Sequence, residues 1–143
     1  LLFDIDDFKL YNDRFGHEAD DVILKETVHL LRSVVRDEDA VARIGGDEFA
    51  VVFWSPKGPR EPDSTHPTDV RRVAERFQQA IAEHRFPALG DAPATLTISG
   101  GLADYPTDGD NVADLVRAAD RRAMESKRAG KNVLTFGAGS QKR

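Results

Sequence analysis

One stretch of this sequence reads Ala42-Arg43-Ile44-Gly45-Gly46-Asp47-Glu48-Phe49-Ala50-Val51-Val52-Phe53-Trp54. An apolar run leads into two glycines and a second apolar run leads out, which is the pattern of a β-hairpin. The bare backbone of Gly45 and Gly46 allows a ligand to approach closely, and the adjacent carboxylates of Asp47 and Glu48 repel each other unless a cation or a proton lies between them. Taken alone, this is better explained as a surface hairpin with solvated acids. Other carboxylates, lysines and glycines at matching places in the rest of the chain favour a functional site instead.

The composition limits the classes of protein that this chain can represent. A chain of 143 residues is one domain with room for a core. Its net charge of −5 argues against a nucleic-acid binder, and its lack of cysteine excludes disulfides and thiolate chemistry, as suits a cytoplasmic location. No apolar run approaches the roughly 20 residues of a membrane span. Residues 1–3 read as the last part of a strand, so we expect upstream sequence, which could carry a membrane anchor, to be missing.

Hydrophobic periodicity and turn residues predict an α/β (α+β) fold. The expected order is β-α-α-β-β-α-β-α-β, whose centre is the split βαβ or ferredoxin-like pattern with a mainly antiparallel sheet flanked by helices. The domain should cover residues 1–137, with a disordered tail at 138–143 and loops at 55–67 and 86–93. The expected strands are 1–5, 40–44, 48–54, 94–103 and 133–136, and the expected helices are 8–15, 17–37, 68–81 (capped by Thr68) and 111–128.

Three carboxylates should converge in this topology. The ferredoxin-like arrangement places the end of the first strand beside the hairpin, so Asp4 can face Asp47 and Glu48. Such a cluster outlines a two-cation site, and ligands that are all oxygen favour Mg²⁺ or Mn²⁺ over zinc. The alternative for the nearby acids Asp6 and Asp7 is that one of them merely caps the helix that follows.

The motifs taken together resemble the GGDEF family, the diguanylate cyclases. The resemblance covers nearly the whole chain in the right order, and it implies a fold shared with class III nucleotide cyclases and polymerase palms. It also implies condensation of two GTP molecules into cyclic di-GMP and pyrophosphate by a homodimer, in which each chain brings one GTP. It rests on Phe3-Asp4-Ile5-Asp6-Asp7-Phe8-Lys9, Asn12-Asp13, Gly16-His17, Asp21, Arg43-Ile44-Gly45-Gly46-Asp47-Glu48-Phe49, Ala119-Asp120, Lys127 and Gly130-Lys131-Asn132.

The resemblance implies a role for each matching residue. Asp4 and Asp47 would bind the metals with help from the carbonyl of Ile5, and Glu48 would be a metal ligand or assist deprotonation of the attacking 3′-hydroxyl. Asn12 and Asp21 resemble the guanine readers. The phosphates and the rest of the substrate would meet the bare backbone of Gly45 and Gly46, the ammonium groups of Lys127 and Lys131, and the backbone amides of Asp7, Phe8 and Lys9 at a helix start.

The resemblance also implies regulation. Arg36 and Asp39 form the Arg-x-x-Asp spacing that marks the family's inhibitory site for the product, and an upstream regulatory domain is expected. The sequence departs from the family pattern at Asp20, where glycine is usual, at Lys131, where arginine is usual, and at Arg122-Ala123-Met124, which replaces an apolar-aromatic segment. The alternative to an active cyclase is therefore an inactive GGDEF-like module that binds GTP or cyclic di-GMP as a sensor. A palm-type domain for another nucleotide chemistry, or a passive dimerisation unit, is a third interpretation.

Overall fold

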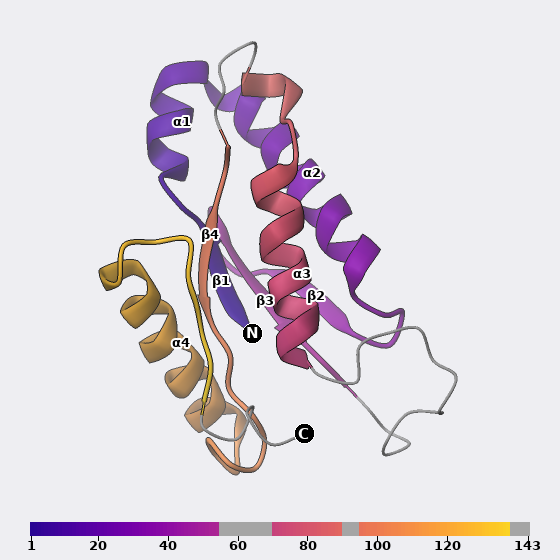
Figure 1. The fold of residues 1–143 in the computed structure, drawn as a ribbon, viewed down its shortest axis with the longest axis vertical. Coiled ribbons are helices and arrows are strands. Elements are labelled where there is room, and N and C mark those ends of the chain that lie inside the picture. Colours follow the sequence, from indigo (N-terminus) through magenta and orange to yellow (C-terminus); the bar gives the residue numbers. More distant parts are fainter. Residues whose placement is uncertain (55–69, 90–94, 138–143) are drawn as a thin grey trace.

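A five-stranded sheet organises the computed structural model, which describes residues 1–54, 70–89 and 95–137. Its strand order is β2-β3-β1-β4-β5 (Figure 1). The strands are β1 (Leu2–Ile5), β2 (Ala40–Arg43), β3 (Glu48–Val52), β4 (Ile98–Gly101) and β5 (Leu134–Thr135). The helices are α1 (Phe8–Phe15), α2 (His17–Val34), α3 (Val70–Glu83), the short 3₁₀ helix η1 (Pro87–Leu89) and α4 (Val112–Arg128).

The central strand β1 runs antiparallel to both of its neighbours, β3 and β4, whereas β4 and β5 pair in parallel. The predicted fold class is thus confirmed: a mixed, mainly antiparallel sheet flanked by helices. The hairpin of β2 and β3 is also confirmed, with Arg43 paired to Phe49 next to the turn.

The two faces of the sheet carry different helices. Phe3 stacks on Phe49 at 5.2 Å between ring centroids and meets the edge of Phe77 from α3 at 5.0 Å, so these side chains face the layer of α2 and α3 (Figure 1). Because neighbouring side chains on a strand alternate between faces, Leu2 and Asp4 lie on the opposite side, where α4 packs. The core therefore lies mainly between the sheet and α2 and α3.

Several element ends differ from the sequence-based expectation. The second helix ends at Val34 and not at 37, because Val35 is already extended (φ −88°, ψ 167°). Strand β4 spans four residues of the ten predicted, and the hairpin strands end earlier than 44 and 54. At the last long helix, Asn111 is the N-cap and accepts from the amide of Asp114. The expectations for the loop at 55–67, the cap at Thr68 and the tail at 138–143 lie outside the described residues.

The capping interpretation of Asp6 and Asp7 is confirmed in position only, at Asp7. Asp7 does occupy the N-cap position of α1, but in the left-handed region at φ 57° and with no hydrogen bond from its side chain to the helix. The carboxylate of Asp6 is buried and bonded to other segments of the chain. Neither carboxylate therefore hydrogen-bonds the start of α1.

Glycines in β4 let α4 approach the sheet. Pairing continues through Gly100 and Gly101 without an inserted residue. A Cβ at Gly101 would lie 2.1 Å from the carbonyl oxygen of Ala119 and 2.6 Å from the amide nitrogen of Ala123. Both obstacles are helix backbone, which cannot rotate away. Glycine is required here by packing.

Replacing Gly101 by alanine should therefore push α4 off the sheet. We expect a loss of about 1–3 kcal/mol in the free energy of unfolding, the range for overpacking a tight contact. Urea denaturation followed by circular dichroism would measure it. Gly46→Ala is the matched control, because a Cβ there meets nothing within 4 Å. Equal losses in the two variants would contradict the packing explanation.

Within the described residues, no helix combines the length and the apolar character needed to cross a membrane.

Candidate functional site

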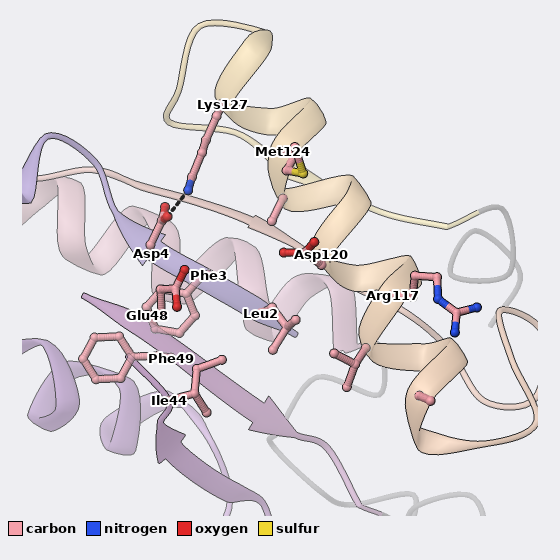
Figure 2. A pocket seen from close by; sticks show the side chains of 13 residues that line it. Leu2, Phe3, Asp4, Ile44, Glu48, Phe49, Arg117, Asp120, Met124 and Lys127 are labelled. Carbon is pink, nitrogen blue, oxygen red and sulfur yellow. Dashed lines mark ion pairs between the residues drawn. The ribbon is translucent and has the colours of Figure 1, made fainter. Parts of the chain in front are cut away.

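The end of β1 and the tip of the hairpin meet at one place. Asp4 is paired directly with Glu48 on the neighbouring strand, and the amide of Ile5 donates to the carbonyl of Asp47 at 3.3 Å. The predicted approach of Asp4 to the hairpin acids is thus seen in the strand register. Figure 2 shows Glu48 and Asp4 side by side, with Lys127 reaching toward Asp4 from α4.

Asp4 has the features of a cation ligand. It is only 8% exposed, and Oδ1 is buried with no hydrogen-bond partner, while Oδ2 pairs with the ammonium group of Lys127. Burial is the main influence on its pKa and raises it. Lys127 opposes that shift, and the charges of Asp47 and Asp6 add to it. An orphaned carboxylate oxygen beside two further acids fits a divalent cation, which would relieve both the desolvation and the repulsion.

The acidic side chains do not by themselves form a complete set of metal ligands. Among the described residues, no three acidic or histidine side chains lie close enough together to hold a metal ion by themselves. Asp47 is half-buried and Glu48 exposed, both at a tip open to solvent. The residues present therefore fit an ion that takes part of its coordination from backbone carbonyls and water, as Mg²⁺ commonly does.

The hairpin tip is held by backbone bonds and by Arg43. The amides of Ile44 and Gly45 donate to the carbonyl of Glu48 at 2.9 and 3.3 Å. The Nε of Arg43 donates to the carbonyls of Gly45 and Gly46 at 3.0 and 2.9 Å, a positioning role that the sequence analysis did not assign. A Cβ at Gly45 would lie 2.6 Å from Oε2 of Glu48, an exposed side chain that can move aside.

The predicted phosphate ligands lie next to the acids. Lys127 pairs with Asp4, and Nζ of Lys131 donates to Oδ1 of Asp7 at 2.5 Å. Their carboxylate partners raise the pKa of both lysines, so both are charged at neutral pH. Phe8 and Lys9 form the first turn of α1, where backbone amides have no partner within the helix. Positive charge and free amides thus border the acids.

Asp6 is the anchor of this region, and the sequence analysis missed that role. Its carboxylate accepts from the hydroxyls of Thr97 and Ser99, each at 2.7 Å, and from the amide of Asn132 at 2.9 Å. It thereby ties the turn after β1 to β4 and to the loop that carries Lys131. The hydroxyls at alternate positions 97 and 99 are the one signal in the sequence that could have suggested a shared polar partner.

The predicted guanine readers lie elsewhere on the surface, where α1 meets α2. The side-chain nitrogen of Asn12 donates to the carboxylate of Asp20, and it lies 3.3 Å from Nδ1 of His17. Asp21, the next residue on α2, is exposed. The structure thus brings Asn12 together with Asp20, the residue that departs from the family pattern.

The predicted inhibitory pair forms a local turn. Asp39 is buried, and its carboxylate accepts from the backbone amides of Arg36 at 2.9 Å and Trp54 at 3.1 Å. Nη2 of Arg36 is buried without a hydrogen-bond partner. Asp39 therefore holds the start of the hairpin in place, and the arginine keeps unused donor capacity.

A pocket of about 300 Å³ runs along α4 beside the acids. Asp4, Glu48 and Lys127 line one end, and the apolar side chains of Leu2, Ile44 and Met124 line its walls (Figure 2). Asp120 also lines it. Arg117 lines it as well, away from the acids (Figure 2). A lining that mixes charged and apolar groups suits a ligand with a charged part and an apolar or aromatic part.

Comparison with known proteins agrees with this geometry. Residues 1–133 match the family described as "Diguanylate cyclase, GGDEF domain", and the chain belongs to that family. It is 34% identical to Diguanylate cyclase A of Treponema denticola over 136 residues, which is 95% of this chain and 34% of that protein. The chain thus spans about a third of that curated relative.

Solved GGDEF domains have the same fold. The active GGEEF domain of a diguanylate cyclase from Vibrio cholerae is 30% identical, with a TM-score of 0.73, and the match covers 94% of this chain and 79% of that one. The GGDEF domain of DgcB from Caulobacter crescentus, solved in complex with c-di-GMP, is 27% identical with a TM-score of 0.71, covering 94% and 74%. This is a fold and a family used in cyclic di-GMP signalling.

Proposed function

We propose that this chain is an active diguanylate cyclase, which condenses two GTP molecules into cyclic di-GMP and two pyrophosphates. The observation that carries the proposal is Asp4, a buried carboxylate with one orphaned oxygen, paired across the strands with Glu48 and adjacent to Asp47. That chemistry is suited to a divalent cation, and membership of the GGDEF family supports GTP as the substrate.

Asp4 and Asp47, with the carbonyl of Ile5, would hold Mg²⁺ or Mn²⁺. When bound, the cation would make the 3′-hydroxyl a better nucleophile and take up charge on the departing pyrophosphate. Glu48, exposed at the tip, would be a ligand or accept the proton of that hydroxyl.

The phosphates would bind beside the acids. Lys127 and Lys131 are each held by a carboxylate partner, so a triphosphate would compete with Asp4 and Asp7 for the two ammonium groups. The amides of Asp7, Phe8 and Lys9 at the start of α1 would add neutral donors to the phosphate oxygens. Gly45 and Gly46 would let the nucleotide lie against the hairpin backbone.

Asn12 and Asp21 would read the guanine. Guanine carries N–H donors at N1 and at its 2-amino group, and a carboxylate accepts from such donors. Adenine has an acceptor at N1, so it would leave these protein groups unpaired, which discriminates strongly in a desolvated site.

Two chains would have to meet for the reaction, because each brings one GTP, and we propose a homodimer as the active form. Cyclic di-GMP would inhibit at Arg36 and Asp39. Because both oxygens of Asp39 already accept backbone amides, Arg36 would make the main contact to the base. An upstream regulatory domain in the whole protein is part of the same proposal.

The test is direct. The chain at high concentration is incubated with GTP and Mg²⁺, and the products are separated by chromatography with mass detection. We expect cyclic di-GMP from GTP, none from ATP, and none when the metal is removed by a chelator. Binding of GTP or cyclic di-GMP without any product, including in a longer chain that carries the upstream residues, would favour the sensor alternative.

A further inference from the structure

Asp20 is a buried carboxylate to which the proposed reaction assigns no task. It lies in the first turns of α2, is 7% exposed, and accepts a hydrogen bond from the side-chain nitrogen of Asn12. Its other oxygen is buried and lacks a hydrogen-bond partner. Burying a carboxylate is costly unless hydrogen bonds offset the loss of hydration. Here the bond from Asn12 does so.

The contact determines which end of the Asn12 amide faces outward. A carboxylate can only accept, so the NH₂ group, and not the oxygen, must point at Asp20. The second hydrogen of the same NH₂ group has an acceptor in Nδ1 of His17, at 3.3 Å, when that nitrogen carries no proton. Asp20 thus takes one donor of Asn12, and Nδ1 of His17 takes the other when it carries no proton. The carbonyl oxygen of Asn12 is the end left for a ligand.

We propose that Asp20 is a positioning residue that holds the Asn12 carboxamide with its oxygen toward the base, so that Asn12 accepts from the 2-amino group of guanine. This inference rests on the proposed function. With the exposed carboxylate of Asp21 next along the helix, the site then offers acceptors to the two adjacent donors of guanine. Without Asp20 the amide can rotate and present donors instead, which guanine's N1 and 2-amino edge cannot accept.

A merely structural role for Asp20 must be distinguished from this one. An acid in the first turn of a helix also stabilises that helix through the dipole, whatever ligand is bound. The informative readout is therefore a comparison of bases. Inosine nucleotides lack the 2-amino group and keep the N1 hydrogen, so loss of helix stability would affect guanine and inosine binding alike.

The experiment measures affinities for GDP and for IDP by calorimetry in the presence of Mg²⁺, because neither diphosphate can undergo the condensation. We expect wild type to prefer GDP, and Asp20→Ala to reduce the GDP-to-IDP preference roughly three- to tenfold, the effect of one ordinary hydrogen bond. Asp20→Asn should keep most of the preference, because its amide oxygen can still accept from Asn12. Glu18→Ala, which removes an exposed acid from the same turn, should leave the preference unchanged.

An unchanged preference in Asp20→Ala would overturn the inference, as would an equal loss for both nucleotides. Should the alanine variant not fold, Asp20→Leu, a good helix former that fills the buried position and cannot accept from Asn12, carries the same expectation. The cyclase assay separates the two proposals: product from wild type together with an unchanged preference refutes only the role of Asp20. Failure of wild type to bind any guanine nucleotide refutes both.

Discussion

Asp47→Asn is expected to lower the rate of cyclic di-GMP formation by on the order of a thousandfold or more. The substitution keeps the shape of the side chain and removes the charge that would hold the cation, and cation stabilisation of a transition state is worth several kcal/mol. The fold should be unaffected, because no hydrogen bond or ion pair of the Asp47 side chain is found among the described residues. We expect the melting temperature to stay within about 2 °C of wild type, as for other surface changes.

The measurement pairs initial rates, at several Mg²⁺ concentrations, with thermal unfolding of the same samples. Asp37→Asn, which neutralises an exposed acid just after α2, is the matched control and should keep the wild-type rate. If Asp47→Asn formed product at the wild-type rate, Asp47 would not be a metal ligand. If the rate were restored simply by more Mg²⁺, its role would be in affinity for the ion and not in the chemical step.

Arg122→Met should produce the largest loss of stability, about 3–5 kcal/mol in the free energy of unfolding. Arg122 forms a bidentate ion pair with Asp108, with hydrogen bonds of 2.7 and 2.6 Å. It also donates to the carbonyl of Leu102 at 2.7 Å. The two side chains are 11% and 10% exposed, so removing the arginine leaves a nearly buried carboxylate with the backbone amide of Asp104 as its remaining donor. Urea unfolding curves would measure the loss.

The control for Arg122 is its exposed neighbour Arg121, whose change to methionine should cost less than about 0.5 kcal/mol. A second variant, Arg122→Met combined with Asp108→Leu, should recover much of the loss, because it removes both charges and not one of them. A single variant as stable as wild type would show that the pair contributes little. Full additivity in the double variant would show that the two residues act independently.

The Arg122–Asp108 pair also predicts how the free energy of unfolding depends on pH. The guanidinium of Arg122 is the main cause that lowers the pKa of Asp108 in the folded chain. A carboxyl group with a depressed folded pKa stabilises the protein fully above its unfolded pKa, near 3.9, and that contribution is lost as pH falls through the lower folded value. Below about pH 4, wild type should lose stability more steeply than Arg122→Met, and parallel curves would contradict the assignment.

The sequence alone was sufficient for the fold class because the signals involved are local. The two glycines between apolar runs predict a hairpin wherever the strands pack, and alternation places Asp4 and Glu48 on one face of adjacent strands. The family motifs were likewise readable as letters in order, and the match over residues 1–133 confirms them. The roles assigned to individual site residues stay predictions.

The misassigned residues have partners far away in the chain. Asp6 was interpreted as a possible helix cap, but its partners Thr97, Ser99 and Asn132 lie 91 to 126 positions away. The role of Gly101 was likewise not predicted, because nothing local in the sequence reveals that the backbone of α4 lies against it. Asp20 lies only 8 positions from Asn12 in the chain, but it is only a departure from a motif until α1 and α2 pack together and bring the two side chains into contact.

The sequence by itself therefore determined the order of the elements, the hairpin and the family, since local periodicity and short motifs specify which face a side chain occupies. Only the tertiary structure decided which polar groups meet: Asp6 with the loop of Lys131, Asp7 with Lys131, Arg122 with Asp108, and Asp20 with Asn12. The physical reason is that a buried charge is satisfied by whichever donor the packing of distant segments brings within about 3 Å, and no local pattern encodes that distance.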